Sequence, residues 1–371
     1  MLHGSRLILG IALSMVAVSS VLAEETEAQR LIKKLLAPPK IQAATGFTAK
    51  VLIPPGQLYD PLFMRPQGEA VWLNDDGGEE NEKGSRLLSL NRQGKISVLA
   101  GLGKLLPITG FDVAPEGFGA FGGQIFTLAQ AKVKVEGAFA NHIIQRVDPA
   151  QHYTASVFCP VPSAGTVNKG TSGAGVEARV GPSGSPFANK FYALTAFNNT
   201  IYQVTADGQC TPFVTLDAQA GAPLGLTFPA DGKSMLVSVS RGGVTDMTKG
   251  GAIVRVLPDG KVEDKPLVTA PTALSGMDFA PEGFGAYAGQ LFVAELGTMQ
   301  IPVPMTQALP ADGKVHRVTP DGQLQLVASG FINPLGLRFV GKSLWVTDVN
   351  GDFIGGMREL PDGFIVEIRA Q

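Results

Sequence analysis

Three acidic residues are candidates for chemistry because each comes at the end of an apolar, strand-like stretch. They are Asp75, Glu295 and Asp348, and Asn350 follows the last of them closely. Carboxylate and amide oxygens are the ligands that Ca²⁺ prefers, and this hard ion takes about six to eight of them. Three carboxylates brought together would repel one another unless a cation or protons neutralised them. The alternative is that these acids cap loops and face water.

One stretch of the chain occurs twice. Gly110–Phe126 and Gly276–Phe292 are identical at twelve of seventeen aligned positions, which indicates a repeat architecture. Each copy reads as a strand, a turn of sequence Pro-Glu-Gly-Phe-Gly and a second strand, and we expect the turn to be structural. Asp112 and Asp278 lie at the same place in the two copies. We expect each carboxylate to accept hydrogen bonds from the backbone of a neighbouring unit, since a buried carboxylate needs partners.

Further strand-like segments group around the two copies into six similar units. Asp-Gly turns at 207–208, 259–260 and 321–322 join the third and fourth strands of three units, as is typical of tight hairpins. Four antiparallel strands repeated in this way predict an all-β fold, a six-bladed β-propeller over residues 45–371. The sixth unit has only three strands, and Thr45–Pro54 has no partner nearby. We therefore expect this N-terminal strand to become the outer strand of the last blade and to close the ring.

The long loops of a propeller share one face, where function usually lies. The predicted loops between second and third strands cover residues 74–84, 129–141, 196–199, 240–250, 295–313 and 348–363. Aligning the ends of the second strands places Asp75, Glu295 and Asp348 at one equivalent position, in three consecutive blades. The sequence thus predicts a small-molecule site at the channel mouth, organised by a divalent cation, with Ca²⁺ as the expected ion and Asn350 as a further ligand.

The N-terminal segment has the pattern of a signal peptide. Residues 1–23 combine a basic start at Arg6, a short apolar run and a small-residue cleavage site, and residues 24–44 read as a helical segment with a linker. We expect a periplasmic or secreted, soluble protein with no membrane span, because the apolar run is shorter than the roughly 20 residues that a span needs. A net charge of −2 argues against nucleic acid as a partner, and we expect a monomer.

The two cysteines have the spacing of neither a zinc site nor a haem site. Cys159 ends the predicted outer strand of the second blade and Cys210 begins that of the third, so we expect a disulfide in an oxidising compartment. His142, His152 and His316 are isolated in the sequence, and we expect structural roles for them. The sequence contains no nucleophile elbow, P-loop or dinucleotide fingerprint.

Two segments carry a resemblance to a known superfamily. Leu224–Ser238 and Leu335–Asp348 resemble blades of the six-bladed propellers that include NHL-repeat proteins, strictosidine synthase-like proteins and the gluconolactonase/senescence-marker family. The resemblance implies a single divalent ion in the channel, which the gluconolactonase family holds with Glu, Asn and Asp side chains. Phe331–Leu337 is similar to the Arg-Asn-Pro-x-Gly-Leu run of soluble quinone-dependent aldose dehydrogenases.

Three functions therefore stay open at the level of sequence. The first is a divalent-metal-dependent hydrolase of the lactonase or esterase type. The second is a non-catalytic propeller that uses its long loops for recognition. The third is a quinone-dependent sugar dehydrogenase. Bound calcium with lactone or ester turnover would select the first function, and dye reduction by sugars with quinone absorbance would select the third.

Overall fold

The structure is a computed structural model of the chain. It describes residues 27–76, 85–101, 105–106, 108–135, 138–161, 175–196, 198–243, 246–298, 309–350 and 360–371. The predicted signal peptide, residues 1–23, lies outside these residues. No helix in the described part of the chain has the length and apolar character needed to cross a lipid bilayer.

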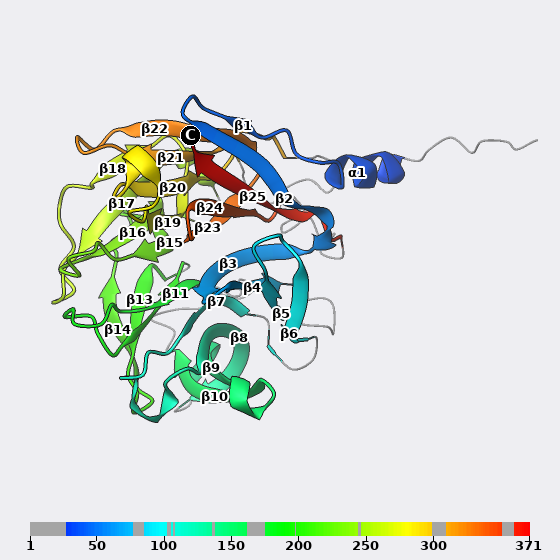
Figure 1. The fold of residues 1–371 in the computed structure, drawn as a ribbon. Helices are drawn as coiled ribbons and strands as arrows, with labels where there is room; N and C mark the ends of the chain where they lie inside the picture. The colour runs from blue at the N-terminus through cyan, green and yellow to red at the C-terminus, as the bar shows by residue number, and fades with distance from the viewer. Residues whose placement is uncertain are drawn as a thin grey trace, which may run out of the picture.

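The described strands form six sheets arranged in a ring, so the predicted six-bladed β-propeller is confirmed (Figure 1). Each blade has four antiparallel strands, which follow one another from the channel outward. Blade 1 contains β3 (Asp60–Gln67), β4 (Ala70–Asp76), β5 (Arg86–Leu90) and β6 (Ile96–Ala100). Blade 2 contains β7 (Ile108–Val113), β8 (Ile125–Val135), β9 (Ala138–Asp148) and β10 (Thr154–Val161). Blade 3 contains β11 (Gly175–Val180), β12 (Phe191–Thr195), β13 (Thr200–Val204) and β14 (Cys210–Thr215).

The second half of the ring repeats this order. Blade 4 contains β15 (Ala222–Thr227), β16 (Met235–Ser240), β17 (Gly251–Val256) and β18 (Val268–Ala270). Blade 5 contains β19 (Leu274–Phe279), β20 (Leu291–Glu295), β21 (Gly313–Val318) and β22 (Leu324–Phe331). Blade 6 contains β23 (Pro334–Val340), β24 (Ser343–Asp348), β25 (Gly363–Ala370) and β2 (Phe47–Leu58). The two strong sequence copies therefore lie in blades 2 and 5, opposite each other.

The ring closes as the sequence predicts. β2 pairs antiparallel with β25, with Val51 opposite Val366, so the N-terminal strand is the outer strand of the last blade. Upstream, β1 (Gln42–Ala43) adds a fifth strand to blade 5 by pairing with β22. Helix α1 (Glu27–Leu35) precedes β1 and lies at the edge of the ring in Figure 1. Both ends of the propeller are thus joined by backbone hydrogen bonds, which leaves fewer open sheet edges.

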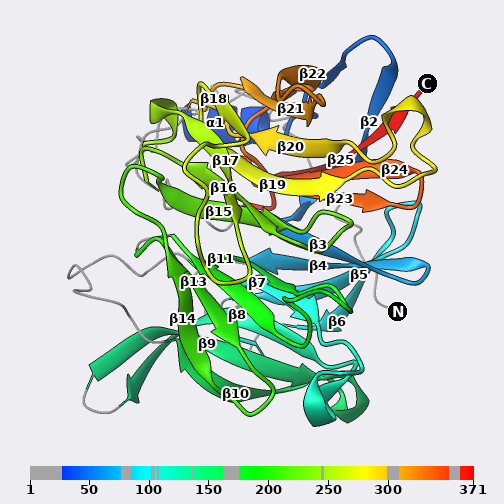
Figure 2. The same cartoon turned by 90° about the vertical axis from the view of Figure 1, so that its left-hand side faces the viewer.

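The two faces of the propeller differ. The turns between first and second strands point toward the viewer of Figure 1, and Figure 2 shows them on its right-hand side. We call this the hairpin face and the opposite one the loop face. Both Pro-Glu-Gly-Phe-Gly turns lie on the hairpin face and have a structural role, as expected. Their phenylalanines, Phe118 and Phe284, are buried and pack edge-on against Phe126 and Phe292 of the following strands.

The prediction of a long loop over residues 129–141 is wrong. β8 continues to Val135 and β9 begins at Ala138, so most of this segment is a strand hairpin. The physical reason is visible in the sequence, where Lys132-Val133-Lys134-Val135 alternates charged and apolar residues with the period of a strand.

Blades 2 and 3 are also joined covalently. Cys159 on β10 and Cys210 on β14 form a disulfide with a Cα–Cα distance of 6.1 Å. Both cysteines belong to an apolar cluster that fills the space between these blades and includes Phe126, Phe191 and Tyr202. The bond therefore ties two outer strands whose inner neighbours already pack together.

Candidate functional site

The three predicted acids end the second strands of their blades on the loop face. Asp75 is the next-to-last residue of β4 and lies opposite Pro61, Glu295 ends β20 opposite Leu274, and Asp348 ends β24. All three carboxylates are buried in the structure. They are therefore not solvated loop residues, and their partners decide what they can do.

Asp348 binds only backbone groups among the partners that the structure gives it. Its two carboxylate oxygens accept hydrogen bonds from the N–H groups of Ile332 at 2.8 Å, Asn333 at 3.0 Å and Asn350 at 2.8 Å. Ile332 and Asn333 belong to the linker between β22 and β23. Asp348 therefore fixes the linker that enters its own blade, and burial raises the pKa of its carboxyl to about 6 in spite of these donors.

Asp75 has the equivalent role in blade 1. One carboxylate oxygen accepts a hydrogen bond from the N–H of Tyr59 at 3.0 Å, in the linker before β3, and the other is paired with the Arg86 guanidinium. Burial raises the pKa of Asp75 to about 6, although Arg86 and the Tyr59 N–H act in the opposite direction. The carboxylate thus has both a cationic partner and a backbone donor inside its own blade.

Glu295 is paired with His316, a histidine for which the sequence predicts a structural role. His316 Nε2 lies 2.7 Å from one carboxylate oxygen of Glu295, and Lys314 Nζ lies 3.5 Å from the same oxygen. The other oxygen accepts a hydrogen bond from the Thr272 hydroxyl at 2.9 Å, in the linker before β19. Burial would raise the pKa of Glu295, but His316, Thr272 and Lys314 together outweigh it and lower this pKa. The position of His316 two residues after Lys314 on β21 could have suggested this pair.

The structure does not gather the predicted metal ligands into one cluster. Among the described residues, no three His, Cys, Asp or Glu side chains are grouped so that they could hold a metal ion. The Asn350 side-chain amide donates to the carbonyl oxygens of Leu35 and Asp362, at 3.1 Å each. The segments that follow Asp75, Glu295 and Asn350 lie partly outside the described residues. The calcium site stays a prediction.

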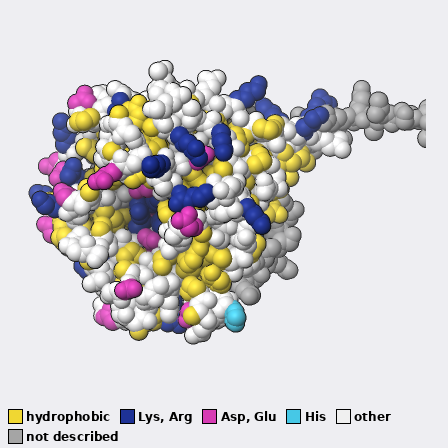
Figure 3. Space-filling model, viewed as in Figure 1, with side chains coloured by type: hydrophobic (Ala, Val, Ile, Leu, Met, Phe, Trp, Pro, Cys, Tyr) yellow, Lys and Arg dark blue, Asp and Glu magenta, His cyan; other side chains and the backbone are white. Residues whose placement is uncertain are grey.

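A second charged cluster, of which the sequence analysis identified only the two aspartates, lies inside the channel. Each innermost strand contributes one residue that pairs with an equivalent second-strand position. In blade order these six residues, which we call the channel ring, are Arg65, Asp112, Arg179, Thr227, Asp278 and Arg338. Figure 3 shows the hairpin face hollowed near the centre, with basic and acidic side chains on the walls of the hollow.

The two aspartates of the channel ring bind backbone, as expected. Asp112 accepts a hydrogen bond from the N–H of Val180 in blade 3 at 2.9 Å, and Asp278 accepts one from the N–H of Phe339 in blade 6 at 3.0 Å. Asp112 also lies 3.3 Å from Arg65 Nε. Each aspartate therefore joins its innermost strand to that of the next blade.

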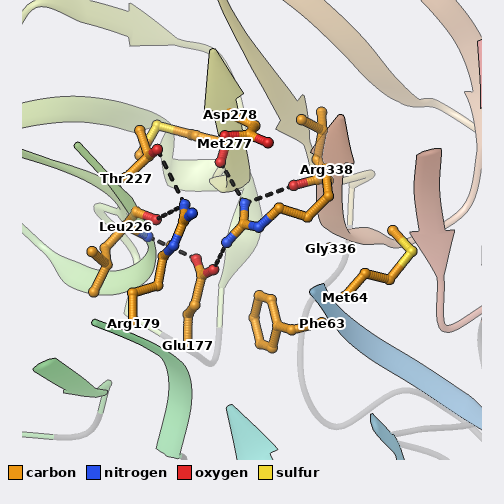
Figure 4. Close-up of polar contacts among 12 residues, drawn as sticks. Phe63, Met64, Glu177, Arg179, Leu226, Thr227, Met277, Asp278, Gly336 and Arg338 are labelled. Carbon is orange, nitrogen blue, oxygen red and sulfur yellow. Dashed lines mark hydrogen bonds and ion pairs between the residues drawn. The ribbon is translucent and has the colours of Figure 1, made fainter. Parts of the chain in front are cut away.

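Glu177 connects two of the three arginines of the channel ring, and Figure 4 shows its contact with Arg338 across the channel. Its carboxylate is paired with Arg338 of the opposite blade, lies 3.2 Å from Arg65 Nη2, and accepts the N–H of Leu226 at 2.8 Å. Glu177 is completely buried, and Arg65 and Arg338 are nearly so. Burial and the nearby Arg338 lower the pKa of Arg65 to about 10, against the pull of Asp112 and Glu177, so Arg65 stays charged at neutral pH. Three guanidinium groups thus lie beside three carboxylates, and the contacts of Glu177 cross the channel at this depth.

The innermost strands approach one another closely around Glu177, and this leaves little space beside its side chain. Four of the six positions that lie two residues before the channel ring are glycines. A Cβ atom at Gly110 would lie 2.4 Å from the Ala178 nitrogen, and one at Gly336 would lie 2.0 Å from the Leu62 oxygen. Only Phe63 and Glu177 carry longer side chains at this layer. The strands can therefore pack tightly, and Glu177 fills the space that remains.

The comparisons with known proteins agree on the fold alone. No protein-family model matches the chain, and no curated protein matches it. A gluconolactonase from Xanthomonas campestris has a similar structure with a TM-score of 0.54 and 14% identity, covering 90% of this chain and 95% of its own. The soluble aldose sugar dehydrogenase from Escherichia coli has a TM-score of 0.55 and 11% identity, covering 88% of this chain and 100% of its own. A streptogramin B lyase has a TM-score of 0.51 and 14% identity, covering 89% of this chain and 100% of its own.

These likenesses define the class of protein. The chain is a six-bladed β-propeller of the architecture shared by gluconolactonase, lyase and aldose dehydrogenase propellers, as the resemblance in the sequence implied. Propellers of one architecture carry many unrelated functions, so function has to be argued from the residues of this chain.

Proposed function

We propose that the protein binds a small molecule at the loop-face mouth of its channel, without catalysis. The observation that carries this proposal is the ion cluster around Glu177, which joins opposite blades across the channel below the mouth. A ligand entering from the loop face would meet this cluster. Concave recesses on a rigid scaffold are the usual places for small-molecule binding.

The partners of the acids favour binding over metal-dependent hydrolysis. A cation would be needed if the three carboxylates lay together, because they would repel one another. Asp75 is instead paired with Arg86, Glu295 with His316, and Asp348 with three backbone N–H groups. Since Asp75 and Glu295 have side-chain partners and Asp348 has three backbone donors, the described residues show no repulsion between these acids that a divalent ion would have to offset.

A metal-dependent hydrolase is the second candidate, and the Glu295–His316 pair favours it. A carboxylate that orients an imidazole is a common arrangement for proton transfer in enzymes. The Nδ1 atom of His316 is buried and has no hydrogen-bond partner among the described residues, so it retains capacity for one more contact. The gluconolactonase neighbour adds lactones to the substrates worth testing.

The melting temperature measured with and without calcium separates the two candidate functions. For the binding propeller, millimolar calcium should leave the melting temperature of chelator-treated protein unchanged, and gluconolactone should not be turned over. For the hydrolase, an ion bound only by the folded state should raise the melting temperature. Glu295→Ala combined with Asp348→Ala should then abolish the rise. A calcium-dependent rise with lactone turnover contradicts the non-catalytic proposal.

The mouth itself is tested by a thermal-shift screen with neutral sugars, sugar lactones and short esters as probes. A probe bound at the mouth should lose its effect in Glu295→Gln and keep it in Glu263→Gln, an exposed glutamate paired with Arg255 on blade 4. The proposed mouth site is wrong if none of these probes changes the melting temperature. It is also wrong if a probe changes the melting temperatures of both variants equally.

We also propose that the protein is exported to the periplasm or secreted. The pattern of residues 1–23 supports this, and so does a disulfide, because such bonds persist in oxidising compartments. Mass spectrometry of the exported protein should find Glu24 as its first residue. A full-length chain in the cytoplasm would contradict export.

A further inference from the structure

A cavity on the hairpin face lies away from the loop-face mouth. Its volume is about 600 Å³, and its walls come from the turn between β19 and β20, the turn between β23 and β24, the turn between β5 and β6, and the end of β25. Figure 3 shows basic side chains gathered on this face around the place where the chain ends in Figure 1. The described ring thus has an open space where blades 5, 6 and 1 meet.

The side chains in the wall of this cavity are predominantly basic. Arg92, Lys342 and Arg369 line it, against Glu367 as the one acidic side chain. Arg369 is paired with Glu367 at 2.8 Å, and Lys50 lies 3.5 Å from the same carboxylate. Arg92 and Lys342 have neither a hydrogen bond nor an ion pair among the described residues. These two cations therefore line the cavity without a counterion among the described residues.

A buried donor in the same wall also lacks a partner. Trp345 lines the cavity and is only 1% exposed, and its indole Nε1 has no hydrogen-bond partner among the described residues. Because protein encloses this atom, Trp345 contributes the surface of its ring to the wall, where a bound ligand would change its environment. Ser343 and Phe284 add a hydroxyl group and an aromatic surface.

Two glycines allow the basic side chains to lie close to the backbone of the turns. A Cβ atom at Gly341 would lie 2.7 Å from Arg92 Nη1, and one at Gly283 would lie 3.1 Å from Lys342 Cγ. The Arg92 guanidinium and the Lys342 stem therefore pass directly over turn backbone. Gly283 belongs to the second Pro-Glu-Gly-Phe-Gly turn, so this turn contributes to the cavity wall as well as to the packing between blades.

We propose that this cavity is a binding site for a small organic anion, a polyhydroxy carboxylate or phosphate. The anionic group pairs with Arg92 and Lys342, as carboxylates and phosphates do with basic side chains. Glu367 and Ser343 accept from ligand hydroxyl groups, and the Trp345 ring forms part of the wall. The site lies on the opposite face from the proposed mouth site, so either can fail without the other.

The test is a titration of the purified full chain with gluconate, with inorganic phosphate and with neutral glucose, followed by calorimetry. Gluconate or phosphate should bind and glucose should not. Lys342→Met and Arg92→Met should each weaken binding about tenfold, the size expected for a lost charged hydrogen bond. Lys233→Met is the matched control, because Lys233 occupies the same Gly-Lys-Ser turn in blade 4 and is also exposed.

Trp345 supplies an independent readout. The chain has two tryptophans, so Trp72→Phe leaves Trp345 as the only one. Its fluorescence should change on titration with the anion that binds, and the change should disappear in Lys342→Met. The proposal is overturned if neither anion binds, if Lys342→Met binds as the wild type does, or if Lys233→Met loses binding equally.

Discussion

Glu177 is the residue whose removal should destabilise the propeller most clearly. Its carboxylate compensates Arg65 and Arg338 and accepts the Leu226 N–H, and it is completely buried. Glu177→Ala leaves three guanidinium groups in the channel facing only Asp112 and Asp278. Breaking a buried ion pair on one side costs about 3–5 kcal/mol, because the remaining charge has no partner.

The expected change in the melting temperature follows from this cost. In a domain of this size about 1 kcal/mol corresponds to about 2 °C, so Glu177→Ala should melt about 6–10 °C below the wild type. Circular dichroism on heating, with urea unfolding as a second measurement, would give both quantities. Glu263→Ala is the control, because Glu263 is 46% exposed and lies 3.4 Å from Arg255. It should cost at most about 1 kcal/mol, as exposed ion pairs do.

A double variant tests whether unpaired charge causes the lost stability of Glu177→Ala. Adding Arg338→Met to Glu177→Ala removes one of the unpaired guanidinium groups, leaving Arg65 and Arg179 against two aspartates. Part of the lost stability should therefore return, since apolar replacements of buried ion pairs are often tolerated. If Glu177→Ala melts no lower than Glu263→Ala, or if Arg338→Met lowers its stability further, the reasoning about charge compensation in the channel is refuted.

Three further predictions concern closure, covalent linkage and pH. Deleting Thr45–Pro54 removes most of β2 and exposes the edge of β25, so the protein should aggregate or lose its cooperative melt; an unchanged melt would contradict the role of β2 in closure. A denaturing thiol assay without reductant should find no free Cys159 or Cys210, and reduction should cost on the order of 4 kcal/mol for this 51-residue separation. Burial raises the pKa of Asp348 to about 6, so the native state holds this proton more tightly than the unfolded chain. The resulting stability is present below about pH 4 and is lost as the pH rises through 6, so the wild type should lose stability relative to Asp348→Asn between these values.

The fold was predictable from sequence because each of the first five blades takes its four strands from one continuous stretch of residues. Closure of the ring is also visible, because it leaves one strand without a neighbour in sequence. The duplicated stretch and the Asp-Gly turns locate individual blades, and an unpaired N-terminal strand together with a three-stranded last unit implies closure. The position of residues 129–141 between the second and third strands predicts a loop, but the Lys-Val alternation within them indicates the observed extension of β8 and β9. The short pairing of β1 with β22 involves only two residues, too few for any periodic pattern.

The strand positions of the three acids were predictable, but their partners were not. The alignment of second strands correctly places Asp75, Glu295 and Asp348 at equivalent strand ends. Their partners lie in linkers whose sequences share no pattern, since Tyr59, Thr272 and Ile332 differ in type and contribute mainly backbone or hydroxyl groups. A backbone N–H donor is present at almost every residue, so sequence alone does not indicate which carboxylate will find one.

The same alignment of second strands also locates the residues of the channel ring. Counting three residues back from the strand-end acids gives Trp72, Phe292 and Trp345, and these pair with Arg65, Asp278 and Arg338 on the innermost strands. The register therefore already placed three arginines and two aspartates around one axis. A lone buried arginine would be costly, and several charged residues of both signs at equivalent inner positions imply mutual compensation. Glu177 breaks the glycine pattern of its layer, and that exception marks the residue that links the opposite sides of the ring.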